Sequence, residues 1–395
     1  MKKFSFLFAL TLLASAIAVS PVKAQDDKQA EFERVWYDTC FTKKDKDKCY
    51  QLSKELIATY PKSTYIPNAT TIVKTRDDIE TYNKANEKFQ AALKAYYSAP
   101  DGNKLDQLFS AGEEFLKIVP NNHFVVGQMA LAGAHGSIGQ IYKNFDKVKG
   151  YGENALKLFE STTPAENWKQ EDWNNLRDIV QAQINQFLGF RLIETKGDKT
   201  EAVGFLTKST MVKGKEGAGW KDPNNYWLRV TIFQEEYQAI RSEYDNLPSD
   251  EAKTGEQGKA ILAKAFAVMD EKLIPDYARV MATATKPETK SLQDAAKGFL
   301  DAYWNYRTKA PEKSAEFVKA FSADPTVASP TIPVKVEEND PATLQAPTGP
   351  AAGTVKLSSG GAPGAGGKSA NGNGKAATTT KGKAAPKATP KKRNK

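Results

Sequence analysis

The stretch from Ile184 to Val212, INQFLGFRLIETKGDKTEAVGFLTKSTMV, decides the fold of this chain. Two sets of mostly apolar residues in it keep helical spacing: Ile184, Phe187, Leu188 and Leu192, then Ala202, Phe205, Leu206 and Ser209. Between them, Gly197 can adopt the positive φ that ends a helix. The stretch therefore predicts two antiparallel helices joined by a tight turn.

Residue size predicts how these two helices pack. Gly189 and Ala202 are small enough to let the helices approach closely, and Phe205 is large enough to fill the core beside them. A single hairpin of this kind cannot bury its second face, so it needs neighbouring hairpins.

The hairpin resembles a tetratricopeptide-type repeat in three places. Leu188-Gly189 matches the Leu-Gly pair of that family, Gly197-Asp198 its turn, and Glu201-Ala202 its small residue on the second helix. One residue is inserted before the turn relative to the family. The resemblance implies an array of helical hairpins that docks a protein or peptide partner.

Similar helical patterns continue on both sides of the hairpin. Asp222-Pro223 marks a helix start, and it is followed by a stripe of apolar residues at steps of three and four. That stripe is Tyr226, Val230, Phe233, Tyr237, Ile240 and Tyr244. Upstream, residues 54–66 and 113–125 echo each other, and residues 72–97 predict one long helix. We therefore expect an all-α antiparallel solenoid of helical hairpins over residues 25–322.

The first 24 residues have the three parts of a signal peptide. Lys2-Lys3 precedes an apolar run from Phe4 to Val19, and a small-residue cleavage motif ends at Ala24. The apolar run is shorter than the ~20 residues that a membrane span needs. We expect export to a periplasmic or extracellular space, with cleavage between Ala24 and Gln25.

The chain has two cysteines, Cys40 and Cys49, and both lie in the exported part. Their surroundings predict the end of one helix and the start of its antiparallel partner, where a disulfide can close the hairpin. Two separate buried thiols are the alternative, but the oxidising compartment favours a disulfide.

The character of the sequence changes at residue 323. An extended, proline-bearing linker leads into a Gly/Ala/Pro/Lys-rich tail with almost no large apolar residues, which predicts disorder over 323–395. Residues 341–395 hold 10 Lys+Arg and no Asp or Glu, whereas residues 25–340 hold 43 Lys+Arg against 47 Asp+Glu. The densest basic block is Lys381, Lys383, Lys387, Lys391, Lys392, Arg393 and Lys395. It could bind an anionic polymer or membrane surface, or it could be only a flexible spacer.

No pattern in the sequence predicts catalysis, a cofactor or a metal. Residues 362–369 match a relaxed phosphate-loop pattern but lack the strand and helix that such a loop requires. His123 and His135 lie twelve residues apart on one predicted helix, about 120° apart around its axis, so they do not share a face.

The sequence thus favours a non-enzymatic exported scaffold that docks an unidentified protein or peptide through a helical-repeat groove. The alternative is an envelope or surface tethering protein whose basic tail binds an anionic polymer or membrane.

Overall fold

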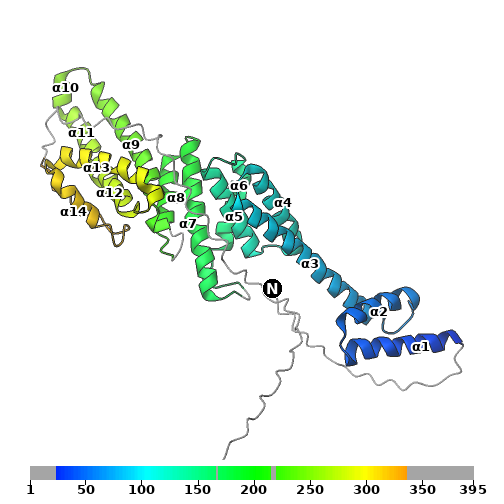
Figure 1. Cartoon of the computed structure of the whole chain (residues 1–395). Helices are drawn as coiled ribbons and strands as arrows, with labels where there is room; N and C mark the ends of the chain where they lie inside the picture. Colours follow the sequence, from blue (N-terminus) through cyan, green and yellow to red (C-terminus); the bar gives the residue numbers. More distant parts are fainter. Residues whose placement is uncertain (1–23, 166–167, 215–218, 336–395) are drawn as a thin grey trace, which may run out of the picture.

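The computed structural model describes residues 24–165, 168–214 and 219–335, and all regular secondary structure in these ranges is helical. The all-α class is therefore confirmed for the described part. The helices form an elongated array that runs from α1 to α14 (Figure 1). The α-helices are α1 (Ala24–Tyr37), α2 (Lys46–Thr59), α3 (Ile66–Ser98), α4 (Gly102–Ile118), α5 (His123–Ile138), α6 (Phe145–Leu158), α7 (Gln170–Glu194), α8 (Lys199–Thr210), α9 (Pro223–Asp245), α10 (Asp250–Thr254), α11 (Glu256–Val268), α12 (Ile274–Thr283), α13 (Lys290–Thr308) and α14 (Ser314–Lys319).

Five shorter elements complete the chain: η1 (Asp38–Thr42), η2 (Gly219–Lys221), η3 (Met269–Leu273), η4 (Pro287–Thr289) and η5 (Pro311–Lys313). Residues 1–23 of the predicted signal peptide lie outside the described residues, and so do residues 336–395. Within the described ranges, no helix combines the length and the apolar composition that a membrane span requires.

Polar side chains at the helix starts explain why the chain breaks into many short helices. In seven of the helices, a side-chain oxygen at the N-cap accepts a hydrogen bond from a backbone N–H of the first turn. Each such cap contributes about 1 kcal/mol to its helix. The caps are Asp45, Asp101, Asn122, Asn144, Asp198, Asp222 and Ser249.

The hairpin predicted from Ile184 to Val212 is formed by α7 and α8, which pack against each other. Ala202 is buried where the two helices touch, as predicted. Gly189 is needed for the close approach, because a Cβ atom there would lie 2.7 Å from Leu206 Cγ and 3.1 Å from the Ala202 carbonyl oxygen.

Two details of the predicted hairpin are wrong. Phe205 is only half-buried, and its neighbour Leu206 is the fully buried core residue of α8. The residue with positive φ at the turn is Lys196 (φ 53°) rather than Gly197. The Gly197 N–H instead donates to the Leu192 carbonyl oxygen at 2.8 Å, which caps the end of α7.

The helix α3 joins a small N-terminal unit to the rest of the molecule (Figure 1). In the N-terminal unit, Trp36, Leu56 and Ala69 form a separate small core. Residues 77–81 in the middle of α3 are all exposed, and the helix is buried again only from Phe89 onward. The prediction of one long helix over residues 72–97 is confirmed, and its exposed middle is tied to α2 by a hydrogen bond from the Tyr50 hydroxyl to Asp77 Oδ1 at 2.7 Å.

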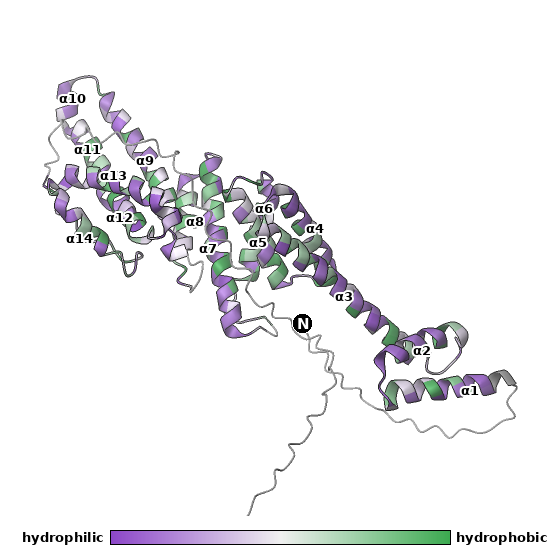
Figure 2. Cartoon of the chain, viewed as in Figure 1, coloured by the Kyte–Doolittle hydropathy of each residue, from purple (hydrophilic) through white to green (hydrophobic). Residues whose placement is uncertain are grey.

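The rest of the described chain has two large cores. The first lies among α3–α7, and α5 is buried over most of its length there because it is mainly apolar (Figure 2). The second lies among α9, α11, α12, α13 and α14. The predicted stripe on α9 faces this second core, with all of its members buried except the half-buried Ile240.

The helical path continues from α11 through η3 into α12, although Pro275 lies at its start. Proline has no N–H to donate, and its ring would clash with the carbonyl oxygen four residues earlier in a regular α-helix. The wider π-helical turn η3 directly precedes Pro275 and accommodates it. This turn also places Asp270 and Glu271 at the surface of the second core.

The helical body does not end at residue 322. The polypeptide continues from α14 as an extended segment that packs against the body as far as Lys335. Phe321 and Ile332 belong to the second core. The disorder predicted from residue 323 onward is therefore wrong for residues 323–335, which turn at Asp324–Val327 and pack on the body, whereas residues 336–395 lie outside the described residues.

Candidate functional site

The extended segment at the end of the described chain defines the candidate site. We call residues 324–335 the strap, and we call the body surface that it covers the strap site. Pro325 and Ile332 are the buried residues of the strap, whereas residues 327–331 between them are exposed. The strap thus buries one residue near each end, and its middle crosses the surface of the body.

Arg279 on α12 holds the first part of the strap through its main chain. Its Nε donates to the Pro325 carbonyl oxygen at 2.8 Å, and its Nη2 donates to the Val327 carbonyl oxygen at 3.2 Å. Both contacts are made to backbone oxygen atoms, which every residue type carries. Arg279 therefore binds the main chain of the turn at Asp324–Val327 largely without regard to its side chains.

A buried carboxylate fixes the position of Arg279. Asp276, one turn earlier on α12, is fully buried and accepts a hydrogen bond from Arg279 Nη1 at 2.8 Å. Arg229 on α9 contacts the other carboxylate oxygen, with Nε 2.9 Å from Oδ2. Because a buried charge must be paired, the carboxylate of Asp276 fixes the guanidinium of Arg279 beside the strap.

An ion pair at the surface ties the start of the strap to the loop that follows α8. Lys213 Nζ donates to Asp324 Oδ2 at 2.7 Å, and the Thr326 N–H donates to Asp324 Oδ1 at 2.9 Å. These hydrogen bonds lower the pKa of Asp324 to about 2. Since both partners are substantially exposed, the pair adds little stability but orients the strap.

The far end of the strap meets a second arginine. The Lys335 N–H donates to the carbonyl oxygen of Arg307 at 3.0 Å. The buried guanidinium of Arg307 makes two hydrogen bonds to Asp270, from Nε at 2.9 Å and from Nη2 at 2.7 Å. It also lies over the Phe266 ring, 3.9 Å from the ring centroid. This arrangement anchors η3 to α13 beside the strap.

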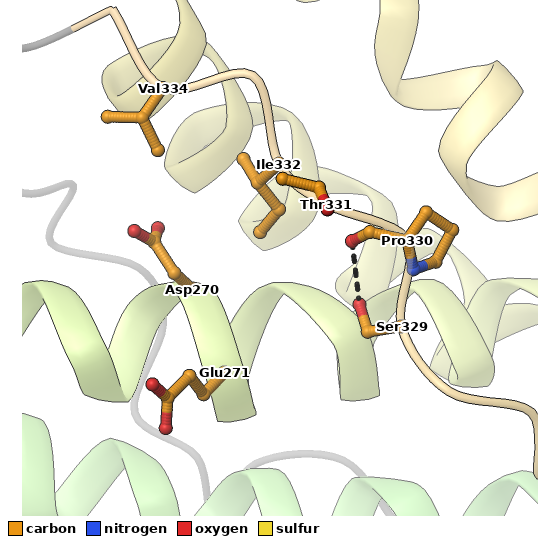
Figure 3. A pocket seen from close by; sticks show the side chains of 7 residues that line it. All are labelled: Asp270, Glu271, Ser329, Pro330, Thr331, Ile332 and Val334. Carbon is orange, nitrogen blue, oxygen red and sulfur yellow. Dashed lines mark hydrogen bonds between the residues drawn. The ribbon is translucent and has the colours of Figure 1, made fainter.

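A cavity of about 420 Å³ lies between the strap and η3. Asp270 and Glu271 line one side, and strap residues line the other, including Ile332 and Val334 (Figure 3). The Ser329 hydroxyl is turned to its own chain and donates to the Pro330 carbonyl oxygen at 3.2 Å. The strap therefore covers the site without filling it.

A second group of polar residues is buried where α7, α8 and α9 meet. Asn225 Nδ2 donates to Ser209 Oγ at 2.9 Å and to the Gly219 carbonyl oxygen at 3.0 Å. Gln186 Nε2 donates to Asp222 Oδ2 at 2.6 Å, and burial raises the pKa of Asp222. These groups bind one another and join the helices, which makes them a structural rather than a ligand-binding group.

The sequence-predicted residues lie elsewhere. Cys40, in η1, and Cys49, in α2, are joined by a disulfide with 2.05 Å between the sulfur atoms. The predicted polyanion-binding block, Lys381 to Lys395, lies outside the described residues. In residues 24–165, 168–214 and 219–335, no group of three or more His, Cys, Asp or Glu residues is arranged to hold a metal ion.

Both histidines lie on α5, far from the strap site in the chain. His123 packs edge-on against Phe159 and Trp173, and His135 Nδ1 is 2.8 Å from the Tyr96 hydroxyl. Burial lowers the pKa of each histidine. Their contacts with core side chains indicate packing roles.

Sequence reasoning missed the whole strap site. Arg279 and Arg307 resemble ordinary charged positions on helices, and Ile332 is one aliphatic residue in a proline-bearing linker. One signal in the sequence could have indicated the strap. Pro325, Ile332 and Val334 are apolar residues in a segment that otherwise resembles a solvated linker.

Comparisons with known proteins give no match. No family model, no curated protein and no solved structure is similar to this chain.

Proposed function

We propose that this protein is a non-enzymatic, exported scaffold whose helical body docks an extended segment of a protein or peptide partner. One observation carries the proposal: the body already binds a segment without helical structure, the strap, through main-chain carbonyl oxygens and two buried side chains. Recognition of this kind is common for extended peptides, where main-chain contacts give affinity and pockets give specificity.

The arrangement of the helices supports a scaffold. Helices that follow each other in the chain pack against each other, as in α3–α4, α5–α6 and α7–α8. Each added pair of helices therefore extends the exposed surface of the array. Together with the resemblance of residues 184–212 to a tetratricopeptide-type repeat, this favours a helical-repeat solenoid. Such arrays expose extended surfaces suited to binding polypeptides.

The charge distribution supports the alternative function of surface tethering. Residues 341–395 carry ten basic residues and no acidic one, while the rest of the predicted mature chain has a small excess of acidic residues. A basic segment of this kind is attracted to polyanions by electrostatics alone. In this alternative the tail binds the polyanion, and the helical body serves only as a spacer.

A displayed library of random peptides separates the two functions. The mature chain, with and without residues 336–395, is immobilised, and bound peptides are sequenced after several rounds. A scaffold recovers the same sequences in both forms, enriched in proline and aliphatic residues. Recovery of acidic peptides only by the form that has the tail would favour tethering, and recovery of no specific peptide would refute the docking function.

A further inference from the structure

We propose that the strap is a displaceable occupant of a docking surface, and that the partner is an extended, proline-containing segment of another protein that competes with it. The inference rests on the proposed docking function and names its site, its partner class and its regulation. The partner would place a proline where Pro325 lies and a large apolar side chain where Ile332 lies.

The first support is that few contacts hold the strap. After Pro325, the backbone N–H groups of the strap make one described hydrogen bond to the body, from Lys335 to Arg307. The exposed residues 327–331 are anchored on one side by Arg279 and on the other by Ile332. A segment that is held near its two ends and exposed in its middle opens more easily than the helices of the core, which makes the strap replaceable.

The second support is the poor fit between the strap and the surface below it. A cavity of about 420 Å³ remains between Ile332 and Val334 on one side and η3 on the other. This space is open to solvent, because Glu271, Thr331 and Val334 in its lining are exposed. A partner with a bulkier side chain than isoleucine would fill this space and remove more apolar surface from water.

The third support is the charge on the cavity wall. Asp270 is neutralised by the two hydrogen bonds from Arg307, whereas Glu271 is exposed and has no ion-pair partner among the described residues. The strap offers it no cation between residues 324 and 334. A partner segment with a lysine or arginine beside its apolar anchor would therefore bind better than the strap.

The test uses the full mature chain and a fluorescent peptide with the strap sequence, SADPTVASPTIPVK, residues 322–335. Two substitutions, Pro325→Ala and Ile332→Ser, weaken the strap without touching the body surface that receives it. Ala328→Ser is the matched control, because Ala328 is exposed in the middle of the strap. Binding of the peptide is measured by fluorescence anisotropy.

We expect the Pro325→Ala/Ile332→Ser chain to bind the peptide at least tenfold more tightly than the wild-type and control chains do. A peptide carrying Ile332→Phe should bind more tightly than the unchanged peptide, and one carrying Ile332→Asp should not bind. These peptide changes cannot unfold the protein, so they test the site directly. Limited proteolysis within residues 327–331 should be faster in the doubly substituted chain.

The outcomes distinguish competition by the strap from the docking function itself. Equal binding of the peptide to wild-type and doubly substituted chains would show that the strap is no competitor, although the docking function would stand. Absence of binding to every chain would overturn both the strap site as a docking surface and the function that rests on it. Equal binding of the Ile332→Phe and Ile332→Asp peptides would refute the apolar anchor.

Discussion

Replacing Gly189 by alanine tests the close contact on which the α7–α8 hairpin depends. The added Cβ atom would lie 2.7 Å from Leu206 Cγ, 2.9 Å from Leu206 Cδ2 and 3.1 Å from the Ala202 carbonyl oxygen. Leu206 is fully buried, and the carbonyl oxygen belongs to the helix backbone, so neither can move away easily. The two helices must separate, or Leu206 must leave its rotamer.

Two opposing terms set the magnitude. Overpacking of a well-packed core costs about 1–3 kcal/mol. Alanine in place of glycine inside a helix contributes about 0.8–1 kcal/mol in the other direction. We therefore expect Gly189→Ala to lower the free energy of unfolding by about 1 kcal/mol, and a larger residue such as valine to lower it further.

Gly204 on α8 provides the matched control. It is exposed, and a Cβ atom there would meet nothing within 4 Å, so Gly204→Ala keeps only the favourable propensity term. This variant should be more stable than the wild type by roughly 0.5–1 kcal/mol. The two variants carry the same chemical change in one hairpin and should shift stability in opposite directions.

Urea denaturation followed by circular dichroism measures both variants. The double variant Gly189→Ala/Leu206→Ala should show coupling, because removing the Leu206 side chain relieves the overlap that the new methyl group creates. If Gly189→Ala and Gly204→Ala raised the unfolding midpoint alike, the close contact between α7 and α8 would be refuted.

Four further predictions concern the disulfide, the buried face of α8, the histidines and the tail. Thiol labelling of unreduced, denatured protein should find Cys40 and Cys49 blocked, and reduction should cost about 2.5 kcal/mol of stability in the chain-entropy model. Leu206→Ala should cost about 2–5 kcal/mol, and half-buried Phe205→Ala less than the roughly 3–5 kcal/mol of a buried phenylalanine, in urea denaturation. Because burial lowers the pKa of both histidines, their contribution to stability is full above pH 6.5 and is lost as the pH falls towards their folded pKa values, which urea titrations at several pH values should show. Removing residues 336–395 should abolish salt-sensitive binding to an anionic polymer or vesicle, measured at two salt concentrations.

The helices could be predicted from the sequence because each follows from local rules. Asp222 and Pro223 begin α9, and the spacing from Tyr226 to Tyr244 marks the face that the second core buries. Periodicity is less informative about which neighbouring residue points inward. Phe205 and Leu206 are adjacent on α8 and about 100° apart, so both lie near the apolar face. Only the position of α7 selects Leu206 for the core and leaves Phe205 at the edge.

The candidate site could not be predicted, because it depends on contacts between residues far apart in the chain. Arg279 meets the Pro325 and Val327 carbonyl oxygens, and Arg307 meets Lys335. No local pattern pairs these residues. The extended conformation of the strap was predictable from its prolines, but its attachment was not, since composition describes how a segment behaves alone and not which surface it meets.

The strap also connects the two proposed functions physically. It joins the second core to residue 336, where the chain leads on to the basic tail. While the strap is bound, Lys335 is held to the body by its hydrogen bond to Arg307. A partner that displaced the strap would free the chain from residue 324 onward and lengthen the tether by up to roughly 40 Å, because an extended residue spans about 3.3 Å. Partner docking would then change the reach of the tail.

The effect can be measured with one fluorophore on the body and one on the tail. Addition of the strap-competing peptide should increase the distance between them. An unchanged distance would show that the two functions are independent.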